Sequence, residues 1–529
     1  MPPAPQSILD RLPLRGRVPA ARGPAGADGT GVDGHSPAAR LGRRLRPVAA
    51  PALIGGGAGL LGYLLVRGSL IDDTYITLCY ARNVAFHGEW ALVPGHTANT
   101  ATSPLNVLLL ALATFVTRNA LLGLAVVFVG CCASLTVSLH GLFADLGLRR
   151  RGGILTALLV IADPLQLSTV GMEVLLVLVL SVALLRSVLA GRAVAAGLLC
   201  AALVLTRPDA AVIALVLVLC GPAVRRRWRT VAAVAVLAAA PWFLVSWIAL
   251  GALLPDSVII KMAVDGWGGL TFGNGLPMYF RWQPTAVLCS VAFAAAGACW
   301  AVPAVLRAEP GSAWRRPVAA LGLAGLAHFA ALTVAAPAPY HWYYVPSVGL
   351  ATIVFGLLCS RPAPGSLQAE FGFGLAAALA VSMVYDVGLG LPWRIAPIST
   401  NWASSAQYAA IGRQLRTHTR GAVVHSAGEV GTIAYYCDCD FMDEFSDRGV
   451  FMGELAQWSR GGGALRRDFV SIDYLFADRS EPAQTPGYTL EVVPWRPPRG
   501  VRYWGIGTPW TESEHVTFHY LELVRWPDN

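Results

Sequence analysis

The sequence predicts a polytopic α-helical membrane protein that ends in an extracytoplasmic α/β domain. Of its 529 residues, 55% are hydrophobic and only 13% are charged. Apolar runs of membrane-spanning length follow one another over residues 47–391, and we count about eleven transmembrane helices plus interfacial helices. Residues 392–529 instead alternate polar and apolar residues, which is typical of strands between turns. This composition argues against a soluble multidomain protein.

The segment before the first apolar run, residues 1–46, is rich in Pro, Gly, Ala and Arg and has no periodic apolar pattern. We expect a disordered cytoplasmic arm there. The arm is too long and too basic for a simple cleavable signal peptide, so the first apolar run is expected to be an uncleaved anchor. The net charge is +9, but most arginines form short clusters between apolar runs, as the positive-inside rule predicts. We therefore expect membrane lipids and no nucleic acid as partners.

The arginines also predict the orientation of the chain. Four arginines within residues 40–46 precede the first span, which places the amino terminus in the cytoplasm. The apolar run at residues 105–117 follows Pro104 and is short for a crossing, so we expect it to lie at the interface. When this helix is left out of the count, the later basic clusters fall inside. The loop at residues 68–103 and the domain at residues 392–529 then fall outside.

Within the last domain we expect strands at residues 422–425, 469–473, 488–493 and 516–524, together with at least one helix. Cys437 and Cys439 lie in this domain with one residue between them. This spacing is too close for the two to pair comfortably with each other, so each is expected to pair elsewhere or to be free.

The acidic doublet Asp72-Asp73 follows the first span directly. Ionisable residues stand at the outer ends of several spans and are nearly absent from span centres, which indicates a site at the outer interface. Such a site suits a substrate with a polar reactive end and a lipid tail, such as a polyprenyl-phosphate sugar. Alternatively, either aspartate caps a helix that starts near Thr74. No certain cofactor is indicated, and a divalent cation bound by Asp72 or Asp73 stays open.

Several motifs carry a resemblance to a known family. Ile71–Thr77, with Tyr80–Asn83 and Thr102–Leu105, resembles the first outer loop of the GT-C superfamily of lipid-dependent glycosyltransferases, and in particular bacterial arabinofuranosyltransferases. Together the motifs cover most of the chain after residue 47. The further matches follow in the family's order and are Gly171–Glu173, Leu205–Asp209, Leu254–Ser257 with Lys261, and Gly428–Gly431 with Tyr435-Tyr436.

The resemblance implies a GT-C-like fold in the cytoplasmic membrane of a bacterium. It also implies a polyprenyl-phosphate donor, such as decaprenyl-phosphate arabinofuranose, and a cell-envelope glycan or glycolipid as acceptor. Transfer would occur outside the membrane with inversion at the anomeric carbon. Residues 96–101 depart from the Gly-Tyr-bearing run expected before Thr102, which leaves the identity of the sugar open.

Displacement of a lipid phosphate needs a base on the acceptor hydroxyl, and a carboxylate suits that task. We expect Asp72 to be this base and Asp73 to orient the acceptor or Asp72, although the reverse assignment is nearly as well supported. Glu173 is expected to bind the acceptor or sugar, or else to be stabilised by the dipole of the helix that it starts. The other residues expected to contact acceptor or sugar are Tyr75, Thr102 and Ser103.

The leaving phosphate needs cations or hydrogen-bond donors, because its charge grows as the sugar departs. The candidates are Arg207, Lys261, His341 and Arg82. Each has a simpler interpretation. Arg207 can snorkel to the headgroups, and Lys261 can be a solvated charge. His341 belongs to an aromatic belt that anchors the protein at the interface, and Arg82 can lie on the polar face of an interfacial helix.

Two other classes of function remain. A non-catalytic scaffold would use its last domain for interaction and would not need the acidic doublet. A transporter of lipid-linked sugars would carry polar residues along a path through the span centres, where this sequence has few. No Walker motif or Gly-rich phosphate loop is present where a cytoplasmic domain could hold it, which disfavours a soluble nucleotide-sugar donor.

Overall fold

The computed structural model describes residues 37–263, 267–309, 311–361, 367–426, 428–512 and 519–525. Most of the predicted disordered arm, residues 1–36, lies outside these ranges, and the chain is helical from Pro37. Residues 48–529 form one compact unit. Within that unit we call residues 48–391 the membrane part and residues 392–525 the tail.

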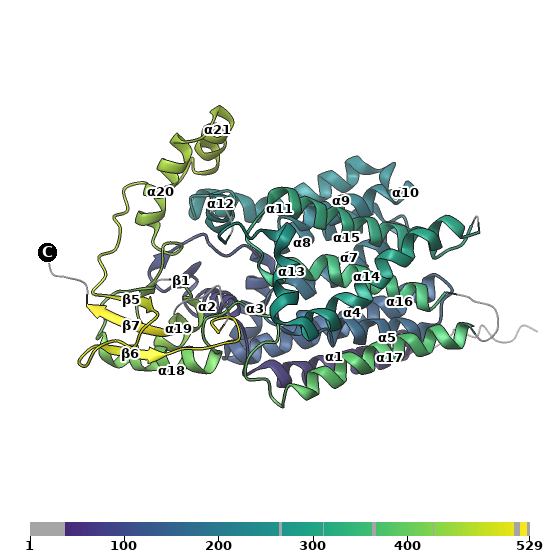
Figure 1. The fold of residues 1–529 in the computed structure, drawn as a ribbon. Helices are drawn as coiled ribbons and strands as arrows, with labels where there is room; N and C mark the ends of the chain where they lie inside the picture. Colours follow the sequence, from purple (N-terminus) through teal and green to yellow (C-terminus); the bar gives the residue numbers. More distant parts are fainter. Residues whose placement is uncertain are drawn as a thin grey trace, which may run out of the picture. The chain divides into compact units, whose positions relative to one another are not determined.

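The membrane part is almost entirely helical (Figure 1). Among the described residues, five helices are long and apolar enough to cross a membrane, namely α1 from Val48, α4, α11, α14 and α15, and shorter apolar helices accompany them. The prediction of a polytopic helical protein is confirmed, whereas the count of eleven spans stays a prediction. The helices are α1 (Pro37–Val66), α2 (Asp72–His87), α3 (Pro104–Thr117), α4 (Ala120–Asp145), α5 (Arg150–Ile161), α6 (Pro164–Leu167), α7 (Val174–Leu189), α8 (Ala193–Thr206), α9 (Ala210–Leu219), α10 (Pro222–Arg225), α11 (Trp228–Ala249), α12 (Asp256–Ala263), α13 (Phe272–Trp282), α14 (Pro284–Arg307), α15 (Arg315–Ala335), the 3₁₀ turn η1 (His341–Tyr343), α16 (Val345–Cys359) and α17 (Leu367–Gly388).

Small residues let the helices approach closely. On α14, a Cβ added at Gly297 would overlap the carbonyl oxygen of Ala351 on α16, so only glycine fits at this crossing. Short side chains at such crossings bring backbones together in lipid, where there is no hydrophobic driving force between helices. Asp163 caps the short helix α6, since its carboxylate accepts hydrogen bonds from Leu165 N at 2.8 Å and Gln166 N at 3.3 Å.

The first loop is folded on itself. Helix α2 is followed by the two-stranded ribbon β1 (Ala91–Val93) and β2 (His96–Thr97). Asn83 fastens the ribbon to the helix, because its side-chain amide donates to the carbonyl oxygens of Ala91 at 2.8 Å and Leu92 at 3.1 Å. The proposal that an aspartate caps this helix is wrong. Ile71 is the N-cap, it provides no side-chain bond, and Asp72 already lies in the first turn.

The tail contains a mixed five-stranded sheet in the order β4-β3-β5-β7-β6, with β3 parallel to both neighbours and the remaining pairs antiparallel. The predicted strands at residues 422–425 and 488–493 are confirmed as β3 and β5, and the fourth corresponds to β7, although residues 516–518 lie outside the described ranges. The tail elements are α18 (Ser405–His418), β3 (Val424–Ser426), α19 (Gly431–Cys437), β4 (Phe441–Met442), α20 (Arg448–Arg460), α21 (Ala464–Asp473), β5 (Tyr488–Val493), β6 (Arg502–Gly505) and β7 (Tyr520–Arg525).

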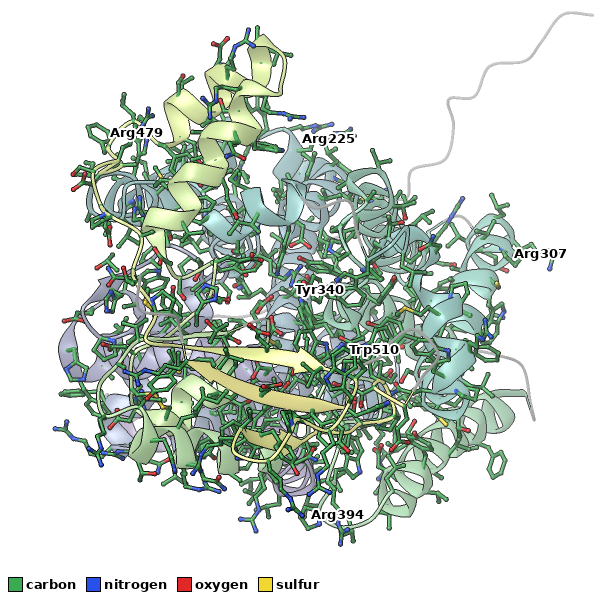
Figure 2. The ribbon with its side chains drawn as sticks, turned by 60° about the vertical axis from the view of Figure 1, so that its left-hand side comes forward. Arg225, Arg307, Tyr340, Arg394, Arg479 and Trp510 are labelled. Carbon is green, nitrogen blue, oxygen red and sulfur yellow. A yellow bond between two sulfur atoms is a disulfide. The ribbon has the colours of Figure 1, made fainter. Side chains whose placement is uncertain are left out.

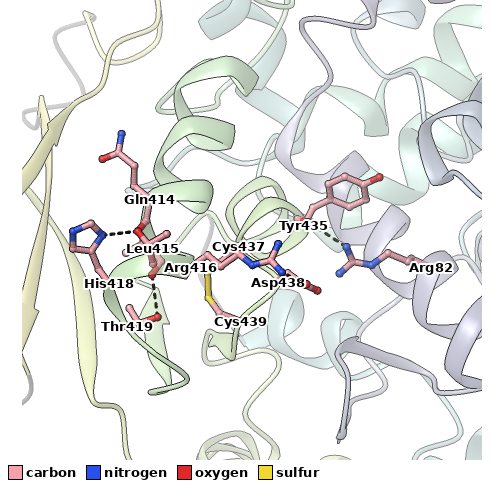
Figure 3. The surroundings of a disulfide bond; sticks show 11 residues. Arg82, Gln414, Leu415, Arg416, His418, Thr419, Tyr435, Cys437, Asp438 and Cys439 are labelled. Carbon is pink, nitrogen blue, oxygen red and sulfur yellow. Dashed lines mark hydrogen bonds and ion pairs between the residues drawn. A yellow bond between two sulfur atoms is a disulfide. The ribbon is translucent and has the colours of Figure 1, made fainter.

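Two predictions for the tail are wrong. Residues 469–473 belong to helix α21 and form no strand. Their short alternation hid a longer spacing of Leu465, Phe469 and Ile472, which is the i, i+4, i+7 pattern of a helix. Cys437 and Cys439 are joined in a disulfide (Figure 3). The two Cα atoms are 5.1 Å apart, within the range that suits a disulfide, and Asp438 between them has φ 51°.

One buried contact joins the first loop to the tail. The two carboxylate oxygens of Asp72 accept hydrogen bonds from the backbone N–H groups of Gly431 at 2.8 Å and Thr432 at 2.7 Å, at the start of α19. The Asp72 N–H in turn donates to Asn401 Oδ1 at 3.4 Å. The backbone at Gly431 lies so close to Asp72 that an added Cβ would overlap the Asp72 carbonyl oxygen.

This contact predicts that Gly431→Ala lowers the free energy of unfolding by about 1–3 kcal/mol, the usual cost of overpacking a well-packed site. The matched control is Gly453→Ala on α20, where nothing lies within 4 Å of the new Cβ. That change should be stabilising by about 0.5–1 kcal/mol, because alanine loses less backbone entropy in a helix than glycine. The measurement is thermal unfolding of both purified variants in one detergent. Equal midpoints for the two variants would contradict the close approach at Gly431.

Candidate active site

A cavity of about 660 Å³ lies between the first loop, the membrane part and the tail. Tyr340 from the membrane part and Trp510 from the tail, which both line it, are labelled in Figure 2. The lining residues from the first loop and the membrane part include Asp72, Asp73, Thr102, Ser103, Glu173, Arg207, Asp209, Ser257, Lys261, His341, Trp342 and Tyr343, and those from the tail include Asn401, Trp402, Glu429 and Asp443.

The two aspartates of the doublet have different surroundings. Asp72 is buried, and both of its oxygens are engaged by the start of α19. Asp73 is half-buried, and its carboxylate makes no hydrogen bond to the tail in the described residues. Burial raises the pKa of Asp73 to about 6, although nearby Lys261 acts to lower it. Asp73 can therefore exchange a proton near neutral pH.

Lys261 lies on α12 against three aromatic rings. Its Nζ is 4.9 Å from the ring centroid of Tyr340, 5.9 Å from that of Trp342 and 5.8 Å from that of Tyr343. Burial acts to lower the pKa of Lys261, but Tyr343, Tyr340 and Asp73 raise it overall, so the side chain is a cation. Within the described part of the chain this ammonium has ring contacts and no ion pair. It can therefore accept an anion from the cavity.

Arg207, by contrast, is occupied by two carboxylates. Its Nε and Nη2 bind the two oxygens of Asp209 at 2.9 and 2.7 Å, and its Nη1 binds Glu173 at 2.6 Å. The guanidinium also lies 5.0 Å from the ring centroid of Tyr343. The two carboxylates take three of its five N–H donors and balance its charge, so Arg207 attracts a substrate phosphate less strongly than an unpaired cation and has mainly a structural role beside the cavity.

The network continues into the membrane part through His328. Its Nε2 is 3.2 Å from Asp209 Oδ2, and its Nδ1 is 2.9 Å from Ser347 Oγ. Burial acts to raise the pKa of Asp209, but Arg207 and His328 lower it overall, so this carboxylate is ionised. Asp209 therefore holds Arg207 and His328 in position, and Arg207 in turn binds Glu173. Arg207 and Glu173 both border the cavity.

The remaining predicted residues divide into two groups. Thr102, Ser103 and His341 line the cavity. Burial lowers the pKa of His341 to about 3, so this histidine is neutral and offers no positive charge to a phosphate.

Arg82 and Tyr75 do not line the cavity. Arg82 donates to the Tyr435 carbonyl oxygen at 3.2 Å, and Figure 3 shows it pointing toward that residue. The Tyr75 hydroxyl is 2.9 Å from Ser405 Oγ, and its ring packs against Tyr435 and Tyr436. Both side chains point from α2 toward α18 and α19, so neither reaches a substrate in the cavity.

Some residues in or beside the cavity were not predicted as site residues from the sequence. Glu429 accepts hydrogen bonds from Asn401 Nδ2 at 2.9 Å and from the Trp402 N–H at 3.1 Å, and so shapes the tail wall. His328 carried a usable signal, because an ionisable residue inside an apolar span is expected to have a partner. No such signal marked Asn401, Trp402 and Trp510, since they come from irregular segments of the tail. Among the described residues, no three His, Cys, Asp or Glu side chains are grouped so that they could hold a metal ion.

The fold and the cavity define a multi-pass membrane protein with a carboxylate and a lysine facing one space beneath a folded tail. No family model and no curated protein sequence matches the chain. Solved structures do match. ArnT from Cupriavidus metallidurans bound to undecaprenyl phosphate has a TM-score of 0.55 and 13% identity, over 91% of this chain and 98% of that chain.

ArnT in the apo state has a TM-score of 0.53 and 14% identity, over 92% of this chain and 98% of that chain. The mycobacterial arabinofuranosyltransferase AftD has a TM-score of 0.43 and 18% identity, over 73% of this chain and 30% of that chain. The two ArnT structures confirm the fold predicted from the sequence motifs. The chain has the GT-C fold.

The charge network predicts a large effect of Arg207→Met on stability. The change leaves Glu173 buried without its partner and leaves Asp209 with His328 alone, which should cost about 3–5 kcal/mol. The matched control is Arg186→Met. Arg186 pairs with Asp145 at 2.9 Å, but the two side chains are 35% and 53% exposed, so its loss should cost less than about 1 kcal/mol. Thermal unfolding in detergent measures both changes. An Arg207→Met variant as stable as Arg186→Met would contradict the buried network.

Proposed function

We propose that this protein is a glycosyltransferase that moves a sugar from a polyprenyl-phosphate donor to a cell-envelope glycan or glycolipid. The observation that carries the proposal is that Asp73 and Lys261 face the same cavity, which offers a base and a cation for a single displacement. The likeness to ArnT bound to undecaprenyl phosphate supports a donor of this chemical class. The volume of about 660 Å³ falls in the usual range for a small-molecule site.

Asp73 is the base in this proposal, and Asp72 is its support. This assignment reverses the first expectation from the sequence. The reason is that both oxygens of Asp72 already accept backbone hydrogen bonds, whereas Asp73 is half-buried beside the cavity. The acceptor hydroxyl oxygen attacks the anomeric carbon and its proton passes to Asp73. The carbon–oxygen bond to the phosphate breaks with inversion.

Lys261 receives the leaving group. As the bond to the anomeric carbon breaks, negative charge collects on the polyprenyl phosphate, and a fixed ammonium stabilises that charge. The rings of Tyr340 and Tyr343 hold the ammonium in position without neutralising it. Arg207 acts indirectly, because it packs on Tyr343 while its own charge is balanced by Glu173 and Asp209.

The sugar, the acceptor and the orientation also belong to the proposal. We favour arabinofuranose as the sugar because of the resemblance of the first loop to arabinofuranosyltransferases. The amino terminus is placed in the cytoplasm of a bacterium and the tail outside, because the arginine clusters then fall on the cytoplasmic side.

Asp73→Asn should lower kcat for sugar transfer by about 10²–10⁴, because the acceptor hydroxyl loses its base, and should leave the unfolding temperature unchanged. Asp72→Asn should instead lower the unfolding temperature, since an amide nitrogen there would face a backbone N–H donor. The assay offers radiolabelled polyprenyl-phosphate sugars and glycan acceptors to the purified protein in nanodiscs. If wild type binds the donor lipid without consuming any donor, the scaffold or transporter alternatives replace the enzyme. An inactive but stable Asp72→Asn beside an active Asp73→Asn would return the base to Asp72.

The pH dependence of kcat/KM tests the pair of Asp73 and Lys261. The base must be ionised, so kcat/KM should fall as the pH drops through about 6, the pKa of Asp73. Lys261→Met removes the charge that lowers this pKa, so the acidic limb should move to higher pH while kcat falls. Lys261→Arg keeps a positive charge and is the matched control, with an acidic limb close to that of wild type. If the acidic limb of Lys261→Met stays at the pH of wild type, Lys261 does not influence the pKa of the base, and the proposed pair is contradicted.

A further inference from the structure

Helix α21 has one buried face and one exposed apolar face. In Figure 1 the pair α20 and α21 extends away from the sheet. One face of α21 is buried, where Val470 and Tyr474, just after the helix, pack with Phe451 and Leu455 of α20 and with Ile259 of α12. The exposed arginines Arg466 and Arg467 lie on the two sides of this buried face, because successive residues of a helix point about 100° apart. The opposite face is apolar and exposed.

The apolar face consists of five large apolar side chains that are exposed next to one another. Leu465 is 88% exposed, Ile472 is 57% exposed and Leu475 is 61% exposed, and Phe469 and Phe476 are exposed beside them. The residues at 465, 469 and 472 follow the i, i+4, i+7 spacing of one helix face, and Leu475 and Phe476 follow in the turn after the helix. We call Leu465, Phe469, Ile472, Leu475 and Phe476 the α21 face. A helix with such a face next to arginines is typical of helices that lie in a membrane interface.

The α21 face continues the lipid-facing surface of a membrane helix. Trp247, near the end of α11, donates from Nε1 to the Ile472 carbonyl oxygen at 2.9 Å, and its ring meets the ring of Phe476 edge-on at 5.2 Å. Helix α11 is one of the candidate membrane helices, and its exposed side chains near this end include Leu244, Val245 and Ile248. Tryptophan is enriched where a membrane helix leaves the hydrocarbon region.

We propose that the α21 face is a membrane-docking surface that lies in the same leaflet in which α11 ends. The apolar side chains enter the boundary between headgroups and acyl chains, and Arg466, at the side of this face, remains at the level of the lipid phosphates. The occupant is the phospholipid bilayer itself, because the face joins a lipid-facing surface without a break. This inference does not depend on the proposed glycosyltransferase activity.

The end of helix α21 is joined by hydrogen bonds to the segment that leads into α12. Asp473 accepts from the N–H groups of Leu253 at 3.2 Å, through its backbone, and of Leu254 at 2.9 Å, through its side chain. The Tyr474 hydroxyl donates to Asp256 Oδ1 at 2.9 Å. These contacts hold the segment that leads into α12, the helix that carries Lys261. A helix anchored in the bilayer therefore fixes the position of Lys261 relative to the membrane surface.

The experiment places a photocrosslinking amino acid, p-benzoylphenylalanine, in the full-length protein in nanodiscs of phosphatidylethanolamine and phosphatidylglycerol. Position 465 reports on the α21 face, position 471 on an exposed polar side of the same helix, and position 245 on the lipid-facing side of α11. Mass spectrometry counts phospholipid adducts after irradiation. We expect position 465 to give about tenfold more lipid adduct than position 471, and to approach position 245.

A matched reporter at position 472 keeps the test decisive if the variant at 465 does not fold, which size-exclusion chromatography detects. Lipid adducts at 472 support the docking surface in the same way. Adducts at 465 or 472 to a second copy of the chain would overturn the proposal in favour of self-association. The absence of lipid adducts at both positions, with adducts still formed at 245, would overturn it in favour of a solvated hairpin.

Discussion

The candidate site depends on the bond between one carboxylate and two backbone N–H groups. Asp72 leaves the first span and binds Gly431 and Thr432 at the start of α19. Hydrogen bonds to a charged group contribute about 1.5–3 kcal/mol each, and a buried carboxylate without them is strongly unfavourable. The contact also leaves Asp73, the next residue on α2, beside the cavity. This contact therefore helps to hold the tail against the first loop beside the cavity.

The cavity is lined by more acidic side chains than basic ones. Among the described lining residues there are six carboxyl side chains, Asp72, Asp73, Glu173, Asp209, Glu429 and Asp443, and two cations, Arg207 and Lys261. Burial raises the pKa of Asp73 to about 6, that of Asp443 to about 6 and that of Glu429 well above its ordinary value. An acidic cavity of this kind would repel a phosphate if every carboxyl were ionised. Partial protonation, together with the uncompensated charge of Lys261, reduces that repulsion.

The sequence predicts much of this arrangement. The apolar runs and the motifs indicate the GT-C fold, and the positions of Asp73, Glu173, Arg207 and Lys261 at span ends place them at one face of the membrane. The directions in which neighbouring side chains point are not predicted by the sequence pattern. Successive residues of a helix point about 100° apart, so which aspartate of the doublet is hydrogen-bonded to the tail depends on where α19 packs.

Contacts between segments that lie far apart in the chain were also not predicted from the sequence. Arg207 and Asp209 are two residues apart, so their pairing could be predicted from the sequence. Glu173 is 34 residues away, and only the folded chain brings it to the same guanidinium. Between Cys437 and Cys439, Asp438 has a left-handed backbone, a conformation that few side chains other than asparagine and aspartate adopt readily, and the spacing of the two cysteines did not predict it. The strand expected at residues 469–473 failed because five residues satisfy both the strand and the helix period.

The bond of Asp72 to α19 also has a consequence for the order of biosynthesis. Its partners follow it by 359 and 360 residues in the chain. During synthesis the first loop leaves the ribosome long before Gly431 exists, and domains generally fold as their residues emerge. The wall formed by Asn401, Trp402, Glu429 and Trp510 is then absent. A nascent chain therefore holds its membrane helices and its first loop without an enclosed cavity, and the site comes into being only after the last domain has been made.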